Sequence, residues 1–189
     1  MADLEIVAPV SPEAWEKWLE KHHTTSPGVW LRMFKKDSGK LNLTYSQAVM
    51  INLCFGWIDS VRHKGDHESF LQRCTPRKKG GMWSKLNTEF VEKMTKEGKM
   101  RPAGMKEVED AKRDGRWDRA YERQGWSKTP PDFLKELKKT PKAFAFYETL
   151  NKVNKYAIYF RLQSAKKPET REKRLKKFLQ MMREGKKFH

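Results

Sequence analysis

Cysteine is scarce in this chain, which has only Cys54 and Cys74 in 189 residues. Disulfide-rich secreted domains contain far more, so this pattern favours two free buried thiols in a reducing compartment. A long apolar run is also missing, and no stretch approaches the roughly 20 residues that cross a bilayer. The opening residues, M-A-D-L-E-I-V-A-P-V, carry acids and a proline where a secretory signal needs basic residues and an unbroken apolar run. We therefore expect a soluble cytoplasmic protein, or a nuclear one in a eukaryote, without a transmembrane segment.

Acidic residues are few relative to basic ones. The chain has 24 Asp and Glu against 41 Lys and Arg, which leaves a formal net charge of +17. An excess of this size attracts nucleic acid, anionic membrane surfaces or acidic proteins, and it says nothing about fold. Apolar residues still make up 37% of the chain, so we expect a packed core in one compact domain or two small ones.

The first half of the sequence predicts helices and strands together. Ser11-Pro12-Glu13 is typical of a helix start, and Thr44-Tyr45-Ser46-Gln47 matches the capping box of a second helix, which Gly56 ends. Three bulky runs predict strands: V-W-L-R-M-F-K after Gly28, W-I-D-S-V-R from Trp57, and F-L-Q-R-C-T before Pro76. We expect the last two to form an antiparallel hairpin across a turn at residues 62–69.

From Ser84 onward the strand signal disappears. Apolar residues at helical spacing predict helices over residues 86–94, 105–111, 133–137, 144–160 and 175–182. The predicted fold is therefore α+β, with a small antiparallel sheet and helices in the N-terminal half and a helical C-terminal half. Gly125 and Pro130-Pro131 break the helical pattern, so we expect an α+β domain over 1–123, a linker over 124–131 and a basic helical region over 132–189.

A basic, glycine-rich loop at residues 76–81 precedes a helix that Ser84 is expected to cap. Glycines let the backbone approach a ligand closely, and a helix start carries unpaired N–H groups, so this stretch suits an anion. The Walker A spacing is absent. A solvated loop whose lysines serve only solubility is the commoner alternative. The candidate anion site comprises Trp57, Asp59, Arg73, Arg77, Lys78, Lys79, Gly80, Gly81, Trp83, Ser84 and Asn87.

Four tryptophans and one aspartate near this loop each have two interpretations. The tryptophans can stack on a base or a sugar beside an arginine, or they can pack in the core, which is their commoner role. They are Trp57, Trp83, Trp117 and Trp126. Asp59 is either a catalytic carboxylate or the partner of Arg62 or Arg73, and we favour the structural ion pair. No nucleophile motif and no metal-binding spacing is assigned, so we expect no catalytic residue, metal or cofactor.

The C-terminal stretch is strongly basic, with eleven Lys or Arg against three acids in residues 161–189. Its apolar residues fall on one helical face, so a phosphate backbone could lie along the other. A membrane surface, a partner protein and an ordinary solvated face are the alternatives. The candidate polyanion-binding residues are Lys166, Lys167, Arg171, Lys173, Arg174, Lys176 and Lys177.

Several motifs follow one another along the chain. They include W-x-x-W-L at Trp15, G-V-W-L at Gly28, L-T-Y-x-x-A-V at Leu43, L-C-F-G-W-I-D-S at Leu53, F-L-Q-R-C-T-P-R at Phe70, W-S-K-L-N at Trp83, and A-K-K-P-E-T-R-E-K-R-L at Ala165. In this order they resemble the YdeI/OmpD-associated family, also described as bacteriocin-protection proteins. The resemblance implies a link to bacteriocin tolerance and envelope stress, with no settled activity or cofactor. It also implies that polar and aromatic residues stay together at the candidate anion site, which favours a pocket over a packed corner.

Three hypotheses about function follow. The leading one is a non-enzymatic stress-tolerance protein that binds nucleic acid or another polyanion through its basic surface. The second is an enzyme or receptor for a small anionic ligand, held in a pocket around Asp59, Arg73, Arg77 and Trp83. The third is a protein-interaction module that docks through its C-terminal helices.

Overall fold

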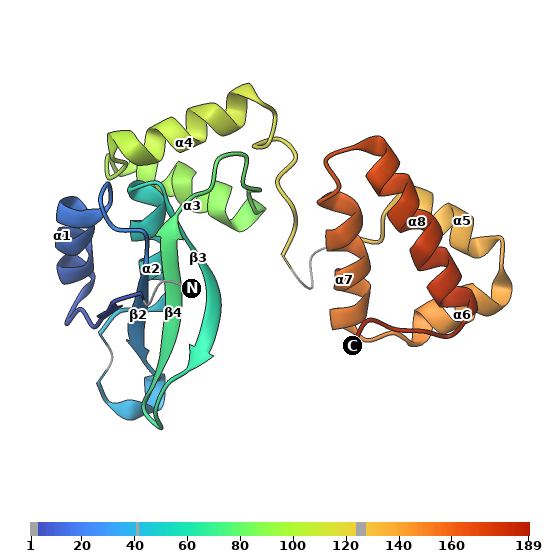
Figure 1. Ribbon diagram of the computed structural model, residues 1–189, viewed down its shortest axis with the longest axis horizontal. Coiled ribbons are helices and arrows are strands. Elements are labelled where there is room, and N and C mark those ends of the chain that lie inside the picture. The colour runs from blue at the N-terminus through green and yellow to red at the C-terminus, as the bar shows by residue number, and fades with distance from the viewer. Residues whose placement is uncertain (1–3, 41, 124–127) are drawn as a thin grey trace. The chain divides into compact units, whose positions relative to one another are not determined.

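The computed structural model describes residues 4–40, 42–123 and 128–189. The chain forms two compact units, unit 1 (Met1–Ala120) and unit 2 (Tyr121–His189). Within the described residues, unit 1 contains a four-stranded sheet with four α-helices, and unit 2 contains four α-helices (Figure 1). The predicted α+β class, with a helical C-terminal half, is confirmed. None of the helices in these ranges combines the length and the apolar content needed to cross a membrane.

The sheet of unit 1 has the strand order β1-β2-β4-β3. Its strands are β1 (Ile6–Val7), β2 (Val29–Phe34), β3 (Trp57–Lys64) and β4 (Ser69–Pro76). The predicted hairpin of β3 and β4 is present, and β2 also pairs antiparallel with β4. β1 was not predicted, and because it runs parallel to β2 the sheet is mixed rather than purely antiparallel.

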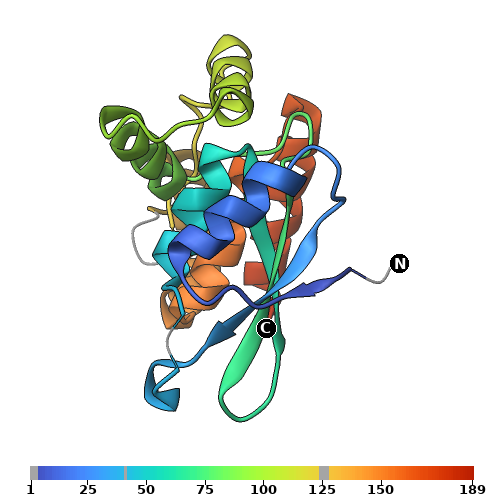
Figure 2. The same ribbon diagram turned by 90° about the vertical axis from the view of Figure 1, so that its left-hand side faces the viewer.

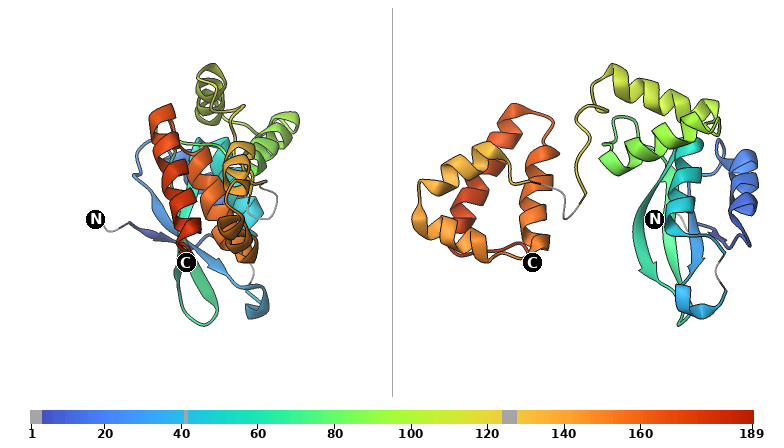
Figure 3. Two further views of the ribbon diagram at one scale, coloured as in Figure 1. Left: turned by 90° about the vertical axis from the view of Figure 1, so that its right-hand side faces the viewer. Right: turned by 180° about the vertical axis from the view of Figure 1, so that it is seen from behind.

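The two faces of the sheet differ in what covers them. Helices α1 (Pro12–His22) and α2 (Tyr45–Cys54) lie side by side over one face (Figure 2). The strands stand in front of α2 in Figure 1, and α2 stands in front of the strands in the view from behind (Figure 3). Alternate residues of β2 point to the helices and are buried, whereas the residues between them are partly exposed. We call the second face the open face.

The core beneath the helices follows from local sequence signals. Ser11 caps α1 by accepting a hydrogen bond from the amide of Ala14 at 3.2 Å, and the predicted capping box of α2 forms between Thr44 and Gln47. These caps fix an amphipathic helix, α1, and a largely buried helix, α2, against the sheet. The buried side chains that meet there include Trp15, Leu19, Leu31, Met33, Cys54 and Trp57.

Two further helices pack beside α2 in unit 1. They are α3 (Lys85–Lys96) and α4 (Pro102–Arg113). Gly104 lets α4 approach the end of α2 closely, because a Cβ there would lie 2.3 Å from the carbonyl oxygen of Cys54. The backbone amide of Arg101 donates to the same carbonyl at 3.1 Å.

A β-bulge interrupts the pairing of β3 with β4. Asp59 faces Cys74 and Arg62 faces Gln72. Between these two pairs β3 advances by three residues, whereas β4 advances by two. The side-chain amide of Gln72 donates to the carbonyl oxygens of Ser60 and Val61 at 3.3 and 3.2 Å. Gln72 is buried, and its amide therefore satisfies the carbonyls that the bulge removes from the ladder.

The described residues of unit 2 form a bundle of four helices (Figure 3). They are α5 (Pro131–Lys138), α6 (Pro141–Thr149), α7 (Lys152–Gln163) and α8 (Pro168–Arg183). The sequence predicted one continuous helical pattern over 144–160, but the chain breaks at Leu150. Asn151 caps a new helix there, since its side chain accepts from the amide of Asn154 at 2.9 Å. The core contains Phe133, Leu137, Tyr147, Ile158, Leu162 and Phe178.

Candidate functional site

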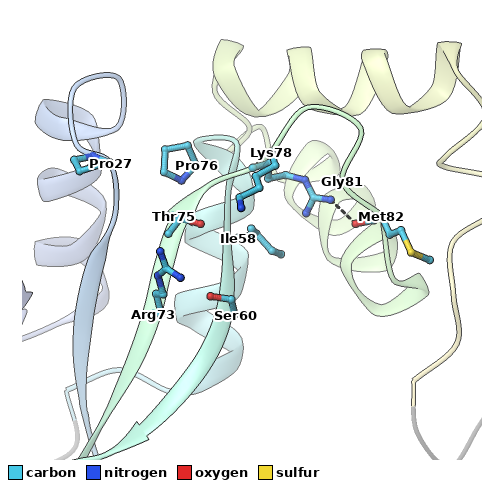
Figure 4. A pocket seen from close by; sticks show the side chains of 10 residues that line it. Pro27, Ile58, Ser60, Arg73, Thr75, Pro76, Lys78, Gly81 and Met82 are labelled. Atoms are coloured by element: carbon cyan, nitrogen blue, oxygen red, sulfur yellow. Dashed lines mark hydrogen bonds between the residues drawn. The ribbon is translucent and has the colours of Figure 1, made fainter. Parts of the chain in front are cut away.

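A hollow of about 530 Å³ lies on the open face of the sheet in unit 1. Strands β3 and β4 contribute alternate residues, and the loop after β4 bounds one side (Figure 4). The residues that line it are Pro27, Ile58, Ser60, Arg73, Thr75, Pro76, Arg77, Lys78, Gly81 and Met82. Three of these side chains are cationic and none is acidic. The lining therefore suits an anion.

The loop of residues 77–82 is held by specific backbone contacts. At its start, the amide of Arg77 donates to the carbonyl oxygen of Gly56 at 2.9 Å. Within it, the amide of Gly81 donates to the carbonyl of Lys78 at 2.8 Å, and Gly80 takes a positive φ of 71° that favours glycine. Arg116 donates to the carbonyl of Gly81 at 2.9 Å. These contacts fix the edge of the hollow in unit 1.

Arg77 is built into this loop. Its guanidinium donates to the carbonyl oxygen of Met82 at 2.7 Å and lies 3.8 Å from the ring centroid of Trp83. Only 9% of the residue is exposed. The stacking on tryptophan and the hydrogen bond orient the charge, so Arg77 shapes the hollow and adds a fixed positive potential.

Arg73 is different because its guanidinium makes no hydrogen bond or ion pair to any described residue. Its Nε atom is buried and has no hydrogen-bond partner in these residues. The side chain rises from the centre of β4 into the hollow (Figure 4). A guanidinium fork matches the oxygens of a phosphate or carboxylate. Arg73 is therefore the side chain of the hollow that is best placed to bind such a group.

Trp57 and Asp59 do not belong to this hollow, contrary to the predicted grouping. Both lie on the helix-covered face of the sheet. The indole of Trp57 is 1% exposed and donates to the carbonyl oxygen of His23 at 3.0 Å. It packs edge-on against Trp15 and Trp18. Core packing is therefore the role of Trp57.

Asp59 has a different partner from the one predicted. It faces Cys74 across the hairpin, whereas the adjacent Arg73 points to the opposite face, so an Asp59–Arg73 pair is ruled out by the alternation of side chains. The hydroxyl of Tyr45 donates to Asp59 at 2.6 Å. Partial burial, with this hydrogen bond, raises the pKa of Tyr45. A hydroxyl supplies the partner that the sequence assigned to Arg62 or Arg73.

The remaining candidate residues lie in or beneath the loop. Trp83 is 1% exposed and packs against Trp117, with a distance of 5.1 Å between ring centroids. Ser84 caps α3 by accepting from the amide of Asn87 at 3.2 Å, as predicted. These residues support the hollow without lining it. Lys79 and Gly80 lie in the loop but are not lining residues, and Trp126 falls outside the described residues.

Six of the ten lining residues are absent from the predicted anion site. Thr75 follows Arg73 by two positions on β4, so the period of a strand places both on one face. Ile58 and Ser60 reach the same face only through the register of the hairpin, which the sequence did not establish. Pro27 precedes β2, and no local signal connects it with the others.

The predicted polyanion-binding residues of unit 2 divide into two groups. Arg171 forms an ion pair with Asp132 of α5, and Arg174 donates to the carbonyl of Arg161 in α7 at 2.6 Å. These two arginines therefore join helices through contacts that the sequence did not predict, and their role in binding a polyanion stays a prediction. The others are exposed lysines: Lys166, Lys167, Lys173, Lys176 and Lys177, of which Lys176 pairs with Glu172 at 2.7 Å.

Comparisons with known proteins divide the sequence in a similar place. Residues 7–107 match the family described as Domain of unknown function (DUF8412). Residues 127–185 match the family described as Bacteriocin-protection, YdeI or OmpD-Associated. No curated protein and no solved structure matches the chain. The motifs of the first half thus fall under the first family, and the resemblance stated from the sequence is confirmed over the helices of unit 2. The chain belongs to the DUF8412 family through residues 7–107, and its residues 127–185 match the YdeI/OmpD-associated family.

Proposed function

We propose that this protein is a non-catalytic receptor for a small anionic ligand, bound in the hollow of unit 1. The observation that carries the proposal is the state of Arg73, a guanidinium that lines the hollow and contacts no acid among the described residues. A partly buried donor without an acceptor destabilises the free protein, and a ligand oxygen would relieve that cost. Phosphate and carboxylate are the groups whose geometry fits the guanidinium fork.

The other groups that line the hollow support binding rather than catalysis. The polar groups there are the hydroxyls of Ser60 and Thr75 and the cations of Arg73, Arg77 and Lys78. A reaction at neutral pH needs a group that accepts a proton, for which a carboxylate, imidazole or thiol is the usual choice. The lining residues offer none of these. The lining residues can bind an anion, but they include no carboxylate, imidazole or thiol for general acid–base catalysis.

The family of residues 127–185 suggests the biological setting. Its description names bacteriocin protection. We extend that role to this chain as part of the proposal. Ligand binding by unit 1 serves a protective, stress-tolerance function, and unit 2 is the part of the chain that matches the bacteriocin-protection family.

Calorimetric titration of the full chain with inorganic pyrophosphate tests the receptor. Hydrogen bonds to charged groups contribute about 1.5–3 kcal/mol, so Arg73→Gln is expected to weaken binding roughly 10- to 100-fold. Lys79→Gln is the matched control, since it removes the same charge from an exposed residue that does not line the hollow. Equal losses of affinity in the two variants would show that the effect comes from net charge alone. Absence of pyrophosphate binding to the wild type would reject the proposed receptor function.

Polyanion binding through unit 2 is a second candidate, favoured by the distribution of charge. Residues 121–189 contain 19 Lys and Arg against 7 Asp and Glu, so most of the net charge lies there. Exposed lysines without a described acidic partner include Lys167, Lys173 and Lys177. Replacing these three by Gln should lower the slope of log affinity against log salt by about 3 for a random duplex. An unchanged slope would remove α8 from consideration.

A further inference from the structure

We propose that the ligand of unit 1 is a free nucleotide, with its phosphate at Arg73 and its base against the rings of Trp30 and His63. This inference rests on the proposed function and adds the chemical class of the ligand. Its basis is the position of an aromatic pair beside Arg73, whose guanidinium makes no hydrogen bond or ion pair to a described residue.

The register of the sheet places Trp30 beside Arg73. The two residues are direct cross-strand partners on β2 and β4, so their side chains share the open face. Direct partners have Cβ atoms about 5 Å apart. A ligand that contacts Arg73 in the hollow is therefore within reach of Trp30, although Trp30 is not one of the lining residues.

The aromatic pair crosses the central strand. His63 of β3 stacks on Trp30, with 4.3 Å between ring centroids and 29° between ring planes. The pair flanks Leu71, which faces His63 across the hairpin. Ile6, the parallel partner of Trp30, is 49% exposed. Aromatic rings with apolar neighbours on an exposed sheet face form a surface on which a planar base can stack.

Charge on the open face decides between a free nucleotide and a nucleic-acid strand. A strand needs cations along its path to follow its phosphates. Beyond Trp30, however, the next guanidinium on β2 is Arg32, which is already bound to Asp66 at 3.0 Å and to Ser69 at 3.3 Å. Positive charge without an acidic partner is therefore concentrated at the Arg73 end. The hollow of about 530 Å³ is also in the size range of small-molecule sites.

Titration of the full chain with four probes tests the inference: inorganic pyrophosphate, adenosine, ADP and a single-stranded oligothymidylate. We expect ADP to bind roughly tenfold more tightly than pyrophosphate because of stacking. Trp30→Leu should abolish that advantage and leave pyrophosphate binding unchanged. The matched control is Tyr45→Leu, which removes an aromatic residue that is 42% exposed and lies on the helix-covered side.

Each outcome has a defined meaning. Equal affinities for ADP and pyrophosphate overturn the nucleotide inference and leave the anion receptor intact. No binding of either probe rejects the proposed function and the inference together. Tighter binding of the oligonucleotide than of ADP overturns the assignment to a free nucleotide. If Trp30→Leu unfolds, His63→Ala replaces it, because His63 is exposed and its loss should reduce the ADP advantage in the same direction.

Discussion

Replacing Gly104 by alanine tests the close packing of α4 against the end of α2. The new Cβ would lie 2.3 Å from the carbonyl oxygen of Cys54 and 2.5 Å from that of Leu53, whereas ordinary contact begins at 3.4 Å. Both neighbours are backbone atoms, so no side-chain rotation relieves the collision, and the helices must separate by about 1 Å. This is an overpacking change between two backbones.

The magnitude follows from two opposing effects. Overpacking costs about 1–3 kcal/mol, and the higher helix propensity of alanine returns at most about 1 kcal/mol. Because rigid atoms are involved, we expect the free energy of unfolding of unit 1 to fall by about 2 kcal/mol and its melting temperature by roughly 5–10 °C. Tryptophan fluorescence can follow this transition, since every tryptophan in the described residues lies in unit 1.

A swapped double variant, Ala103→Gly with Gly104→Ala, provides the control. It keeps the composition of α4 constant, so intrinsic helix propensity nearly cancels and any loss reports the position of the methyl group. Propensity alone predicts that Gly104→Ala stabilises the helix. An unchanged or raised melting temperature for that variant would therefore refute the packing argument.

Three further predictions concern buried and paired groups. Asn52→Ala should cost about 2–4 kcal/mol, because it leaves the indole N–H of Trp15 without its acceptor at 3.0 Å and creates a cavity; chemical denaturation measures this. Both thiols should resist Ellman's reagent at pH 8 in the native protein, since burial raises the pKa of Cys74 to about 12. The ion pair with Arg171 lowers the pKa of Asp132. The ion pair therefore stabilises the folded protein above the ordinary carboxyl pKa of 3.8, and this stabilisation is lost as the pH falls below that value and Asp132 becomes protonated. Asp132→Asn should reduce stability slightly at pH 6 and have no effect near pH 2.

The contrary results are equally concrete. A stability loss below about 1 kcal/mol for Asn52→Ala would mean that water or a rearranged partner satisfies the indole. Rapid stoichiometric labelling of native protein, with the denatured protein as reference, would show that a thiol is accessible. A stability difference between wild type and Asp132→Asn that persists at pH 2 would show that the carboxylate charge is not its source.

Local signals in the sequence were sufficient for most helices. Ser11 and Thr44 form the caps that their spacing predicts, because a cap depends on residues only three positions apart. Strand β1 was not predicted because it has two residues and pairs with Trp30 and Leu31, which lie far along the chain. A pattern with period two cannot be recognised in two residues.

The candidate site was harder to predict because it depends on which face a side chain occupies. Asp59 and Arg73 are close in the hairpin, yet one points to the helices and the other to the open face. Sequence spacing alone does not give the register that separates them. Similarly, the lysine and arginine count of unit 2 was known, but the pairing of Arg171 with Asp132 arises only when α8 meets α5.

The bulge in β3 has a further consequence for how the protein can change by insertion and deletion. With regular pairing, Val61 would face Gln72, and Arg62 would then move to the face that carries Trp30, while His63 would leave it. Loss of a single codon within the bulge would instead leave Arg62 opposite Gln72 and His63 opposite Leu71, so the imidazole stays beside the indole while the bulge disappears. Homologous sequences that lack one residue at the bulge should therefore keep the same ligand chemistry beside the indole.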